Sequence, residues 1–297
     1  MSHVDTEIAS QPACWRRALD THGARLQALP RDGERVAVIG CGTSLYIAQT
    51  YAALRESAGR GETDAFAASE FPAARRYDRV LAISRSGTTT EVLTALKQAA
   101  GTPTVAVTGD LGTPVKDAAD TVVDLSFADE RSVVQTRFAT TALVLLRAGL
   151  GLVPPDLLRQ AEYTLGTRLP EEFLGARQFT FLGSGWAVGV AHEAALKLRG
   201  TAGAWTESYP AMEYRHGPIS VTGPGSVVWF FGEPPAGLLD QVRATGAYAT
   251  VSPGDPLADL IRAQRLAVAL AGRRGLDPDQ PRHLTRSIVL ADHLVES

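Results

Sequence analysis

Two hydrophobic patterns alternate along the first half of the chain. Short, continuous apolar runs, typical of strands buried on both faces, are followed by segments in which apolar residues recur every three or four positions, as they do in helices. Alternating strands and helices favour a parallel sheet that is covered by helices on both faces. The predicted strands are residues 35–39, 62–67, 80–83, 104–108 and 121–125, and the predicted helices are residues 45–57, 90–100 and 138–148.

The opening pattern recurs in the second half of the chain. An apolar run at residues 178–182, a Gly183-Ser-Gly185 turn and a predicted helix at residues 187–199 repeat the order found at residues 35–57, which indicates an internal duplication. We therefore predict an α/β fold made of two tandem parallel-sheet α/β sandwiches. The expected divisions are an N-terminal helix in residues 1–30, with its helical spacing at 10–29, a first subdomain in residues 31–150, and a second in residues 151–290 that includes a C-terminal tail.

Composition narrows the functional classes. The net charge of −3 over 297 residues gives no basic footprint for nucleic acid, and no apolar run approaches the ~18 residues that a membrane span needs. Cys14 and Cys41 are too few for a disulfide scaffold or a zinc site, and no pair among the six histidines has metal-ligand spacing. We expect a cytoplasmic protein that binds no metal and needs no cofactor.

A cluster of hydroxyl residues lies where the strand at residues 80–83 turns into the next helix. Unpaired N–H groups and the positive end of the helix dipole favour an anion at such a point, and hydroxyl groups add further donors. Gly87 lets the backbone approach closely, and the lack of a lysine after it excludes a nucleotide P-loop. The alternative is a capped turn with solvated hydroxyls. The hydroxyl residues are Ser84, Ser86, Thr88 and Thr89.

A second hydroxyl-bearing turn, Gly40-Cys-Gly-Thr43-Ser44, follows the first strand. Its G-x-G spacing could indicate a dinucleotide site, but Leu45 stands where the third glycine of that fingerprint would be. Because ligands of parallel sheets collect beyond the carboxyl ends of the strands, both turns could converge on one anion. Residues 231–235 of the second half read Phe-Gly-Glu-Pro-Pro, without such a cluster, so we expect one phosphate site, in the first half.

Ionisable side chains gather in the second half. Glu193 and Lys197 lie four apart on a predicted helix that Gly200 would end, so they share a face; the alternative to a functional pair is an ordinary exposed ion pair. Residues 207–218 form a predicted irregular loop with two carboxylates, an arginine and a histidine, which is either functional or simply solvated. The polar tail, residues 276–287, contains two prolines and precedes an apolar run, which indicates that it is held in place.

In their order along the chain, these motifs resemble those of the double sugar isomerase (SIS) domain family, which includes the isomerase half of glucosamine-6-phosphate synthase, amino-sugar phosphate deaminases and fructoselysine-phosphate deglycases. The resemblance extends from Val36 to Ser287 and implies two flavodoxin-like SIS subdomains, the first of which binds phosphate. The motifs are Gly40-Cys-Gly-Thr-Ser44, Ser84-x-Ser-Gly-x-Thr89, Glu193-x-x-x-Lys197, Arg215-His-Gly-Pro218 and Asp279-Gln-Pro-Arg282.

The resemblance also implies roles for individual residues. His216 would open the pyranose ring, since an imidazole can both accept and donate a proton near neutrality. In the family this histidine reaches into the site of the neighbouring subunit, which implies a homodimer. The residues implied to bind a small-molecule sugar phosphate are Thr43, Ser44, Ser84, Ser86 and Thr89 at its phosphate, and Val133 and Gln135 at its sugar.

Two positions depart from the family pattern. The isomerase base is a glutamate sixteen residues before that histidine, where this chain has Gly200. The lysine that engages the open sugar is replaced by Arg286, which is expected to contact the substrate but cannot form a Schiff base. Glu193, one helical turn before Lys197, is then the best remaining base, and Glu207 is the second.

These residues predict a cofactor-free lyase that acts on an amino-sugar 6-phosphate such as N-acetylglucosamine 6-phosphate. His216 opens the ring, Glu193 removes the C2 proton, and the enolate expels the C3 hydroxyl because no base is placed to reprotonate C1. One alternative is an isomerase or deaminase that uses Glu207 or Glu193. The other is a non-catalytic sensor that binds the sugar phosphate.

Overall fold

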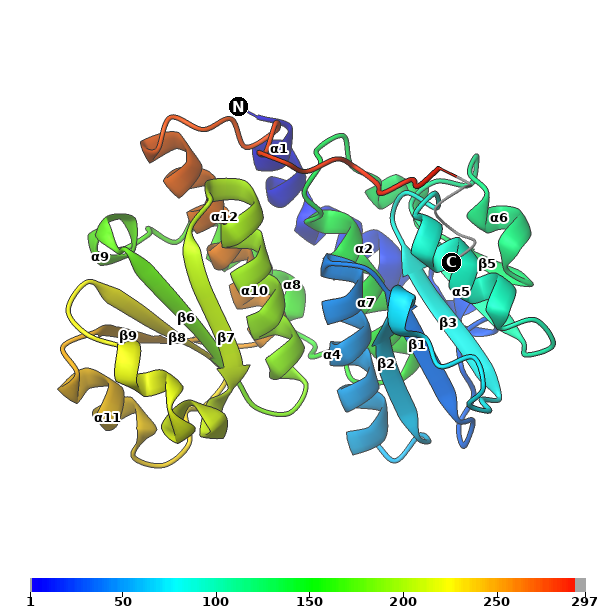
Figure 1. The fold of residues 1–297 in the computed structure, drawn as a ribbon, viewed down its shortest axis with the longest axis horizontal. Coiled ribbons are helices and arrows are strands. Elements are labelled where there is room, and N and C mark those ends of the chain that lie inside the picture. Colours follow the sequence, from blue (N-terminus) through cyan, green and yellow to red (C-terminus); the bar gives the residue numbers. More distant parts are fainter. Residues whose placement is uncertain (1, 292–297) are drawn as a thin grey trace. The chain divides into compact units, whose positions relative to one another are not determined.

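The computed structural model describes residues 2–291, and the chain divides into two compact units. The five-stranded unit comprises Cys14–Leu152 with Thr285–Ser297, and the four-stranded unit comprises Met1–Ala13 with Val153–Leu284. Each unit is a parallel sheet covered by helices (Figure 1), which confirms the predicted α/β fold with two tandem sheets. Residues 285–291 therefore belong with the first sheet, although they come after the second in the sequence.

The five-stranded sheet is built from apolar runs that are buried on both faces. Its strands are parallel and follow the order β2-β1-β3-β4-β5. Every residue of the first and fourth strands is buried, which explains why these segments read as continuous apolar runs. Each strand lies within one residue of a predicted run. The strands are β1 (Val36–Gly40), β2 (Thr63–Ala67), β3 (Arg79–Ser84), β4 (Thr104–Thr108) and β5 (Thr121–Asp124).

Helices cover both faces of this sheet. They are α4 (Thr43–Ser57), α5 (Thr90–Gln98), α6 (Val115–Ala118) and α7 (Arg137–Gly149). On one face, Val92 and Leu96 of α5 pack with Ile39 and Val80 of the strands. On the other face α4 and α7 lie side by side and pack against each other (Figure 1). The three helices predicted in this region are therefore confirmed.

The N-terminal segment holds three short helices where one was expected over residues 10–29. The chain leaves the helical path at Thr21, whose hydroxyl donates to the Arg17 carbonyl (2.6 Å) and so competes with continuation of the helix. Trp15 is fully buried and donates through Nε1 to Thr140 Oγ1 of α7 (2.9 Å), which attaches this part of the segment to the five-stranded unit. The helices are α1 (His3–Ala9), α2 (Gln11–Asp20) and α3 (His22–Leu26).

The four-stranded sheet is also parallel and has an aromatic core. Its strands are β6 (Gln178–Gly183), β7 (Trp205–Pro210), β8 (Ser226–Phe231) and β9 (Tyr248–Val251), in the order β7-β6-β8-β9. Its helices are α8 (Leu157–Gly166), α9 (Glu171–Gly175), α10 (Ala187–Ala202), α11 (Leu238–Ala244) and α12 (Pro256–Arg273). The rings of Trp229 and Phe231 stack at 5.8 Å on one face, and Leu238 and Val242 of α11 pack on the other. α10 and α12 pack against each other.

The first four strands of each unit have the same order, because β2-β1-β3-β4 corresponds to β7-β6-β8-β9. The first strand of each unit along the chain, β1 or β6, also ends in the same way. A Cβ on Gly40 would lie 2.6 Å from the carbonyl carbon of Ser44, and one on Gly183 would lie 2.2 Å from the carbonyl oxygen of Ala187. Only glycine fits at either place, since the next helix begins against the strand end. The repeated pattern in the sequence therefore corresponds to a repeated unit of structure.

α10 extends past Gly200, which was expected to end it. Gly200 lies inside the helix, and the left-handed residue that ends it is Gly203, with φ +58°. The N–H of Gly203 donates to the Arg199 carbonyl (3.0 Å), as the residue after a helix commonly does. The departure from the family pattern at position 200 therefore lies on the last turn of a helix.

Candidate functional site

The turn between β3 and α5 is closed by hydrogen bonds of its own hydroxyl groups. Ser84 Oγ accepts the N–H of Gly87 (3.2 Å), and Ser86 Oγ accepts the N–H of Thr88 (3.3 Å). Gly87 has φ +63°, and a Cβ on it would lie 2.0 Å from Thr113 Oγ1. The turn therefore requires glycine at this position. We call the hydroxyl groups of the turn at the N-terminus of α5 the cradle; they belong to Ser86, Thr88 and Thr89.

Both hydroxyl-bearing turns open onto one small pocket of the five-stranded unit. In this pocket the side chains of Ser44 and Gln135 approach to 3.5 Å. Thr43, the first residue of α4, and Val133 are not among its lining residues. The two turns thus meet beyond the carboxyl ends of β1 and β3. The predicted binding residues that line the pocket are Ser44, Ser84, Ser86, Thr89, Gln135 and Arg286.

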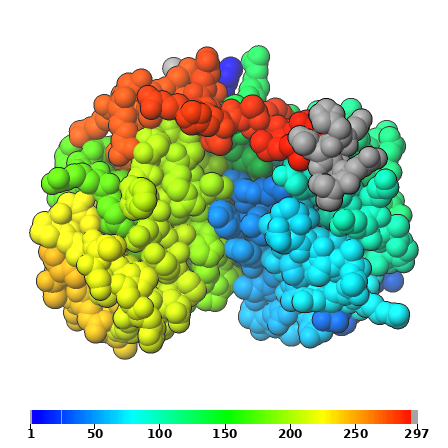
Figure 2. Space-filling model, in the orientation of Figure 1, coloured from blue at the N-terminus to red at the C-terminus, as the bar shows by residue number. Residues whose placement is uncertain are grey.

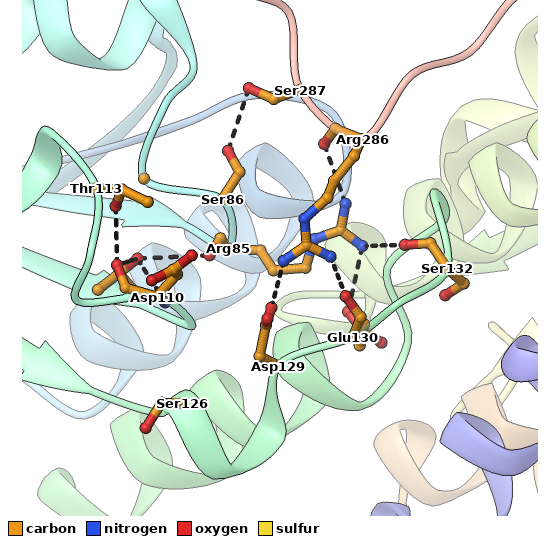
Figure 3. Close-up of polar contacts among 12 residues, drawn as sticks. Arg85, Ser86, Asp110, Thr113, Ser126, Asp129, Glu130, Ser132, Arg286 and Ser287 are labelled. Carbon is orange, nitrogen blue, oxygen red and sulfur yellow. Dashed lines mark hydrogen bonds and ion pairs between the residues drawn. The ribbon is translucent and has the colours of Figure 1, made fainter.

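The C-terminal segment lies in the cradle. The hydroxyl of Ser86 donates to Ser287 Oγ at 3.2 Å (Figure 3). The hydroxyl of Thr88 donates to the same atom at 2.9 Å, and Thr89 Oγ1 lies 3.3 Å from it. The Ile288 carbonyl accepts the N–H of Thr90, the first residue of α5, at 3.1 Å. The tail is therefore held in place, and it uses the donors that an anion at this helix end would use. The sequence analysis assigned no role to Ser287.

Arg85 fastens the cradle turn to the neighbouring loop. Its buried guanidinium donates from Nη1 to the Ser132 carbonyl (2.9 Å) and from Nη2 to the carbonyls of Val133 (2.9 Å) and Arg286 (3.0 Å). The Glu130 carboxylate lies 3.5 Å away (Figure 3). Burial lowers the pKa of Arg85, and the negative charge of Glu130 opposes that shift. One buried cation thus positions the pocket wall and the tail, a role that the sequence did not indicate.

The guanidinium of Arg286 is engaged with the protein itself. Its Nη2 lies 2.6 Å from Asp129 Oδ1, and its Nη1 donates to the Glu130 carbonyl. The substrate contact predicted for this residue would therefore be made from a side chain that is already ion-paired. The pair also fixes the start of the tail, one residue before Ser287.

The predicted base and its lysine form a buried pair in the four-stranded unit. Lys197 Nζ lies 3.1 Å from Glu193 Oε1, and the two side chains are only 3% and 2% exposed. The alternative of an ordinary exposed ion pair is therefore wrong. Because burying charges is costly, such a pair is not by itself evidence for a role in stability. Buried ionisable pairs are also common at active sites, which makes this pair a candidate for catalysis.

Glu207 and His216 do not share an irregular loop, contrary to expectation. Glu207 lies on β7, an edge strand that pairs with β6 alone and tolerates Pro210 at its end. His216 is exposed at the end of a short 3₁₀ helix (Ala211–His216). Gly217, with φ +132°, then leads into a second short 3₁₀ helix. Because its imidazole is exposed to solvent, His216 could reach another molecule.

A histidine beside Glu193 was not singled out from the sequence. His192 Nδ1 lies 2.8 Å from Ser208 Oγ, which links α10 to β7. Burial lowers the pKa of His192, and the positive charge of Arg199 lowers it further, so the ring is neutral near pH 7. The pair lies next in sequence to both candidate carboxylates, Glu193 and Glu207.

Some chemistry can be set aside for the part of the chain that is described. Burial, assisted by the charge of Glu91, raises the pKa of Cys41 to about 11, so this pocket thiol is a poor nucleophile near neutrality. Within residues 2–291, no group of three or more His, Cys, Asp or Glu side chains is arranged to hold a metal ion. None of the described helices has both the length and the apolar character to cross a membrane.

Comparison with known proteins gives matches over most of the chain. A sequence model of the SIS domain matches residues 31–148. The glutamine–fructose-6-phosphate aminotransferase (isomerizing) of Pyrobaculum aerophilum is 31% identical over a 263-position alignment that covers 72% of this chain and 44% of that protein. A Thermus thermophilus protein of the same name is 29% identical over 88% of this chain and 53% of its own length. The chain thus spans about half the length of these relatives.

Solved structures share the fold at lower identity. Glucosamine-6-phosphate deaminase of Thermotoga maritima superposes with a TM-score of 0.82 at 24% identity, covering 97% of this chain and 100% of that one. Tagatose-6-phosphate ketose/aldose isomerase of Escherichia coli superposes with a TM-score of 0.75 at 18% identity, covering 94% of this chain and 95% of that one. At these identities the likeness concerns the fold. The sequence match shows that residues 31–148 of this chain form a sugar isomerase (SIS) domain, and the chain as a whole shares the fold of these solved structures.

Proposed function

We propose that this chain is an enzyme that acts on the 6-phosphate of an amino sugar. The observation that carries the proposal is the cradle, where three hydroxyl groups converge on one oxygen atom at the start of α5. Hydroxyl and N–H donors at a helix N-terminus suit a phosphate group. The relatives' names, which include fructose 6-phosphate and glucosamine 6-phosphate, support a sugar phosphate as the ligand.

Binding of the phosphate would displace Ser287. Its hydroxyl lies within 3.3 Å of every hydroxyl of the cradle, and the Ile288 carbonyl occupies the first N–H of α5. A phosphate oxygen needs the same donors, so the tail and the ligand compete for them. Ser44 and Gln135, from the other side of the pocket, are placed to bind the ligand once the tail has moved.

The proposed chemistry uses ionisable groups of the four-stranded unit. His216 would open the sugar ring in the site of a neighbouring subunit, which requires a homodimer, and its exposure supports that role. Glu193 would then remove the proton from C2 of the open aldose. Lys197, 3.1 Å from Glu193, can supply a proton to C1 of the resulting enolate. This pairing favours proton transfer from C2 to C1 over loss of water.

For a 2-amino sugar, that transfer releases ammonia. Moving the C2 proton to C1 leaves an imine at C2, and water hydrolyses the imine to a ketose 6-phosphate and ammonia. An isomerase that acts on such a sugar is therefore also a deaminase, which is the reaction we propose for this chain.

A dehydratase is the second candidate, and Gly200 favours it. The side chain that serves the related isomerases as a base is absent at this position, so a 2-acetamido sugar could instead lose its C3 hydroxyl as water. This is the reaction expected from the sequence. In either case Glu193 would remove the C2 proton after the ring has opened.

A mass-resolved assay separates these possibilities. The protein is incubated with glucosamine 6-phosphate and with N-acetylglucosamine 6-phosphate, beside Glu193→Gln. Release of ammonia from the first substrate supports the deaminating isomerase, and loss of water from the second supports the dehydratase. Thermal stabilisation by both compounds without turnover would mean a sensor and would overturn the enzymatic proposal.

Complementation tests whether His216 acts in the neighbour's site. His216→Ala and Glu193→Gln should each be inactive alone. If the histidine acts across a homodimer interface, mixing the two variants restores about a quarter of the wild-type activity, because half of the dimers are mixed and each has one intact site. No recovery after proven subunit exchange would contradict this arrangement.

A further inference from the structure

A second concavity lies in the four-stranded unit, at the place where two of its helices end. It has a volume of about 730 Å³, within the range of small-molecule sites. Its walls are the last turn of α10, the residues that follow α12, and residues 280–283. Figure 2 shows the orange segment after α12 on the surface of the molecule. We call this concavity the basic pocket, after the side chains described next.

The charges around the basic pocket are unbalanced. The one carboxylate in its wall, Asp277, accepts the N–H of Asp279 at 2.9 Å. Three arginines line the pocket: Arg199, Arg274 and Arg282. No carboxylate among residues 2–291 lies within ion-pair distance of them, whereas the adjacent Arg273, outside the pocket, pairs with Glu171 at 3.0 Å. The missing partners are thus a property of the pocket rather than of this helix end. The basic side chains in its wall are Arg199, Arg274, Arg282 and His283.

Two of the arginines are held in position by hydrogen bonds to neighbouring residues. Arg199 Nη1 lies 3.0 Å from Thr206 Oγ1 and 3.3 Å from the Thr206 carbonyl, and Arg274 Nη1 donates to the Ala202 carbonyl at 2.9 Å. In both side chains the Nη2 and Nε donors have no acceptor among the described residues. A guanidinium that is already oriented loses less freedom when it binds a carboxylate or a phosphate.

The segment that completes the pocket is also fixed. The Asp279 carboxylate accepts the N–H groups of His3 and Val4, at 2.7 and 2.9 Å, which ties the segment to the start of α1. His283 has φ +62° and is the one residue other than glycine with positive φ in the described chain. Backbone held in this sparsely populated region is often found at ligand sites. The pocket is therefore a built feature of the unit.

We propose that the basic pocket binds a small polyanion, whose phosphate or carboxylate groups pair with Arg199, Arg274 and Arg282. Carbonyl groups at the ends of α10 and α12 would repel an anion, so the arginines must supply the attraction. This site is additional to the cradle, and its existence does not depend on the reaction proposed above. Whether the anionic groups are phosphates or carboxylates decides which class of metabolite the pocket recognises.

Calorimetry with inorganic pyrophosphate and with citrate tests the proposal. The variant is Arg274→Gln with Arg282→Gln, and the matched control is Arg273→Gln, which removes an adjacent exposed charge outside the pocket. Ser86→Ala serves as the cradle variant. We expect at least one probe to bind the wild type with an affinity that falls at least about tenfold in the double variant. The control should keep the wild-type affinity for that probe, and the cradle variant should keep the affinity of the site that the double variant weakens.

Three results would overturn the proposal: neither probe binds, binding survives the double variant, or binding is lost equally in Arg273→Gln. Stronger binding of pyrophosphate would assign a phosphorylated ligand, and stronger binding of citrate would assign a carboxylated one. The thermal midpoint of each variant shows whether it is folded, and exposed arginines of this kind should change it little. If probe binding is lost in Ser86→Ala but kept in the double variant, the probe binds at the cradle, and the proposal for the basic pocket is also overturned.

Discussion

The turns after β3 and β8 occupy the same place in two sheets of the same order, yet only one of them forms a cradle. After β3, hydroxyl residues surround Gly87, which packs against Thr113. After β8 the chain reads Gly232-Glu-Pro-Pro235, and proline has no N–H to offer an anion. The scaffold of strand, turn and helix is therefore common to both units. Anion binding has to be added by the residues of the turn.

The helices that follow β1 and β6, α4 and α10, differ in the opposite way, because here the four-stranded unit carries the functional side chains. Counted from Gly40 and Gly183, which end β1 and β6, Glu193 and Lys197 correspond to Thr50 and Leu54. The four-stranded unit thus has a buried ionisable pair where the five-stranded unit has a hydroxyl and an apolar side chain. Under the proposed function, the two units divide the work, with phosphate binding in one and proton transfer in the other.

The largest effect should come from breaking the buried ion pair beside the cradle. Arg85→Met removes the cation next to the buried Glu130 carboxylate, which should cost about 3–5 kcal/mol in urea unfolding and abolish phosphate binding. Arg262→Met is the matched change in the other unit, since Arg262 Nε lies 2.8 Å from Asp259 Oδ1. It should also destabilise the chain but spare phosphate binding in the folded protein. Equal loss of binding in both variants would contradict the division of work.

Glycine substitutions sharpen the comparison of the turns. In Gly87→Ala the residue keeps a positive φ and its new Cβ would lie 2.0 Å from Thr113 Oγ1. We therefore expect the free energy of unfolding to fall by about 2–4 kcal/mol and phosphate binding to be lost. Gly185→Ala also has a positive φ, but nothing lies within 4 Å of its new Cβ. It should lower the free energy of unfolding by only about 1 kcal/mol and leave phosphate binding unchanged. Denaturant midpoints and phosphate titrations measure both effects. Similar costs for the two variants would show that close packing at Gly87 is unimportant.

Removal of one cradle hydroxyl should weaken binding without unfolding the protein. Ser86→Ala deletes a donor to the phosphate, which should lower the affinity for a sugar phosphate about tenfold or more, since hydrogen bonds to charged groups contribute about 1.5–3 kcal/mol. Ser220→Ala, at an exposed serine of the four-stranded unit, is the control and should change nothing. Calorimetric titration checks both variants. An unchanged affinity in Ser86→Ala would remove the cradle from the site.

Substitution in the C-terminal tail should strengthen phosphate binding, whereas loss of a cradle hydroxyl should weaken it. Ser287→Ala removes a competitor from the cradle, so phosphate should bind a few-fold more tightly, in keeping with about 0.5–1.5 kcal/mol for a neutral hydrogen bond. Val289→Ala, at a side chain that is 69% exposed, is the control in the same segment. Weaker binding in Ser287→Ala would mean that the tail assists the ligand instead of competing with it.

The smallest effect concerns the pH dependence of the four-stranded unit. Because the pKa of His192 is lowered by folding, the unfolded chain binds more protons in the interval between the two pKa values. Stability should therefore fall as the pH drops below about 6.5, the ordinary value for histidine. Thermal midpoints between pH 5 and pH 8 should fall less steeply in His192→Gln. If the thermal midpoint depends on pH equally steeply in the wild type and in His192→Gln, this histidine does not contribute to the pH dependence of stability.

The sequence predicted most of the elements of the five-stranded unit, because its strands are apolar throughout and its helices are regularly patterned. It missed β7, where Trp205-Thr-Glu-Ser-Tyr-Pro210 is a half-polar edge strand without a continuous apolar run. It also placed the end of α10 at Gly200, since glycine inside a helix and glycine after one look alike in a sequence.

The candidate site was predicted less completely, for a physical reason. The cradle hydroxyls are local to one turn and could be recognised from their spacing. The contact of Ser86 with Ser287 joins residues 201 positions apart, so no local pattern reveals it. The burial of Arg85 is likewise a tertiary property, because an arginine in a polar turn is usually exposed.

The central claim is that the cradle binds the phosphate of a sugar whose carbon atoms the other unit transforms. Its most direct test is calorimetric titration of the wild type and of Ser86→Ala with glucosamine 6-phosphate and with unphosphorylated glucosamine. We predict binding of the phosphate alone by the wild type, with a loss of about tenfold or more in the variant. Equal binding of the two sugars, or an unchanged affinity in Ser86→Ala, would contradict the account.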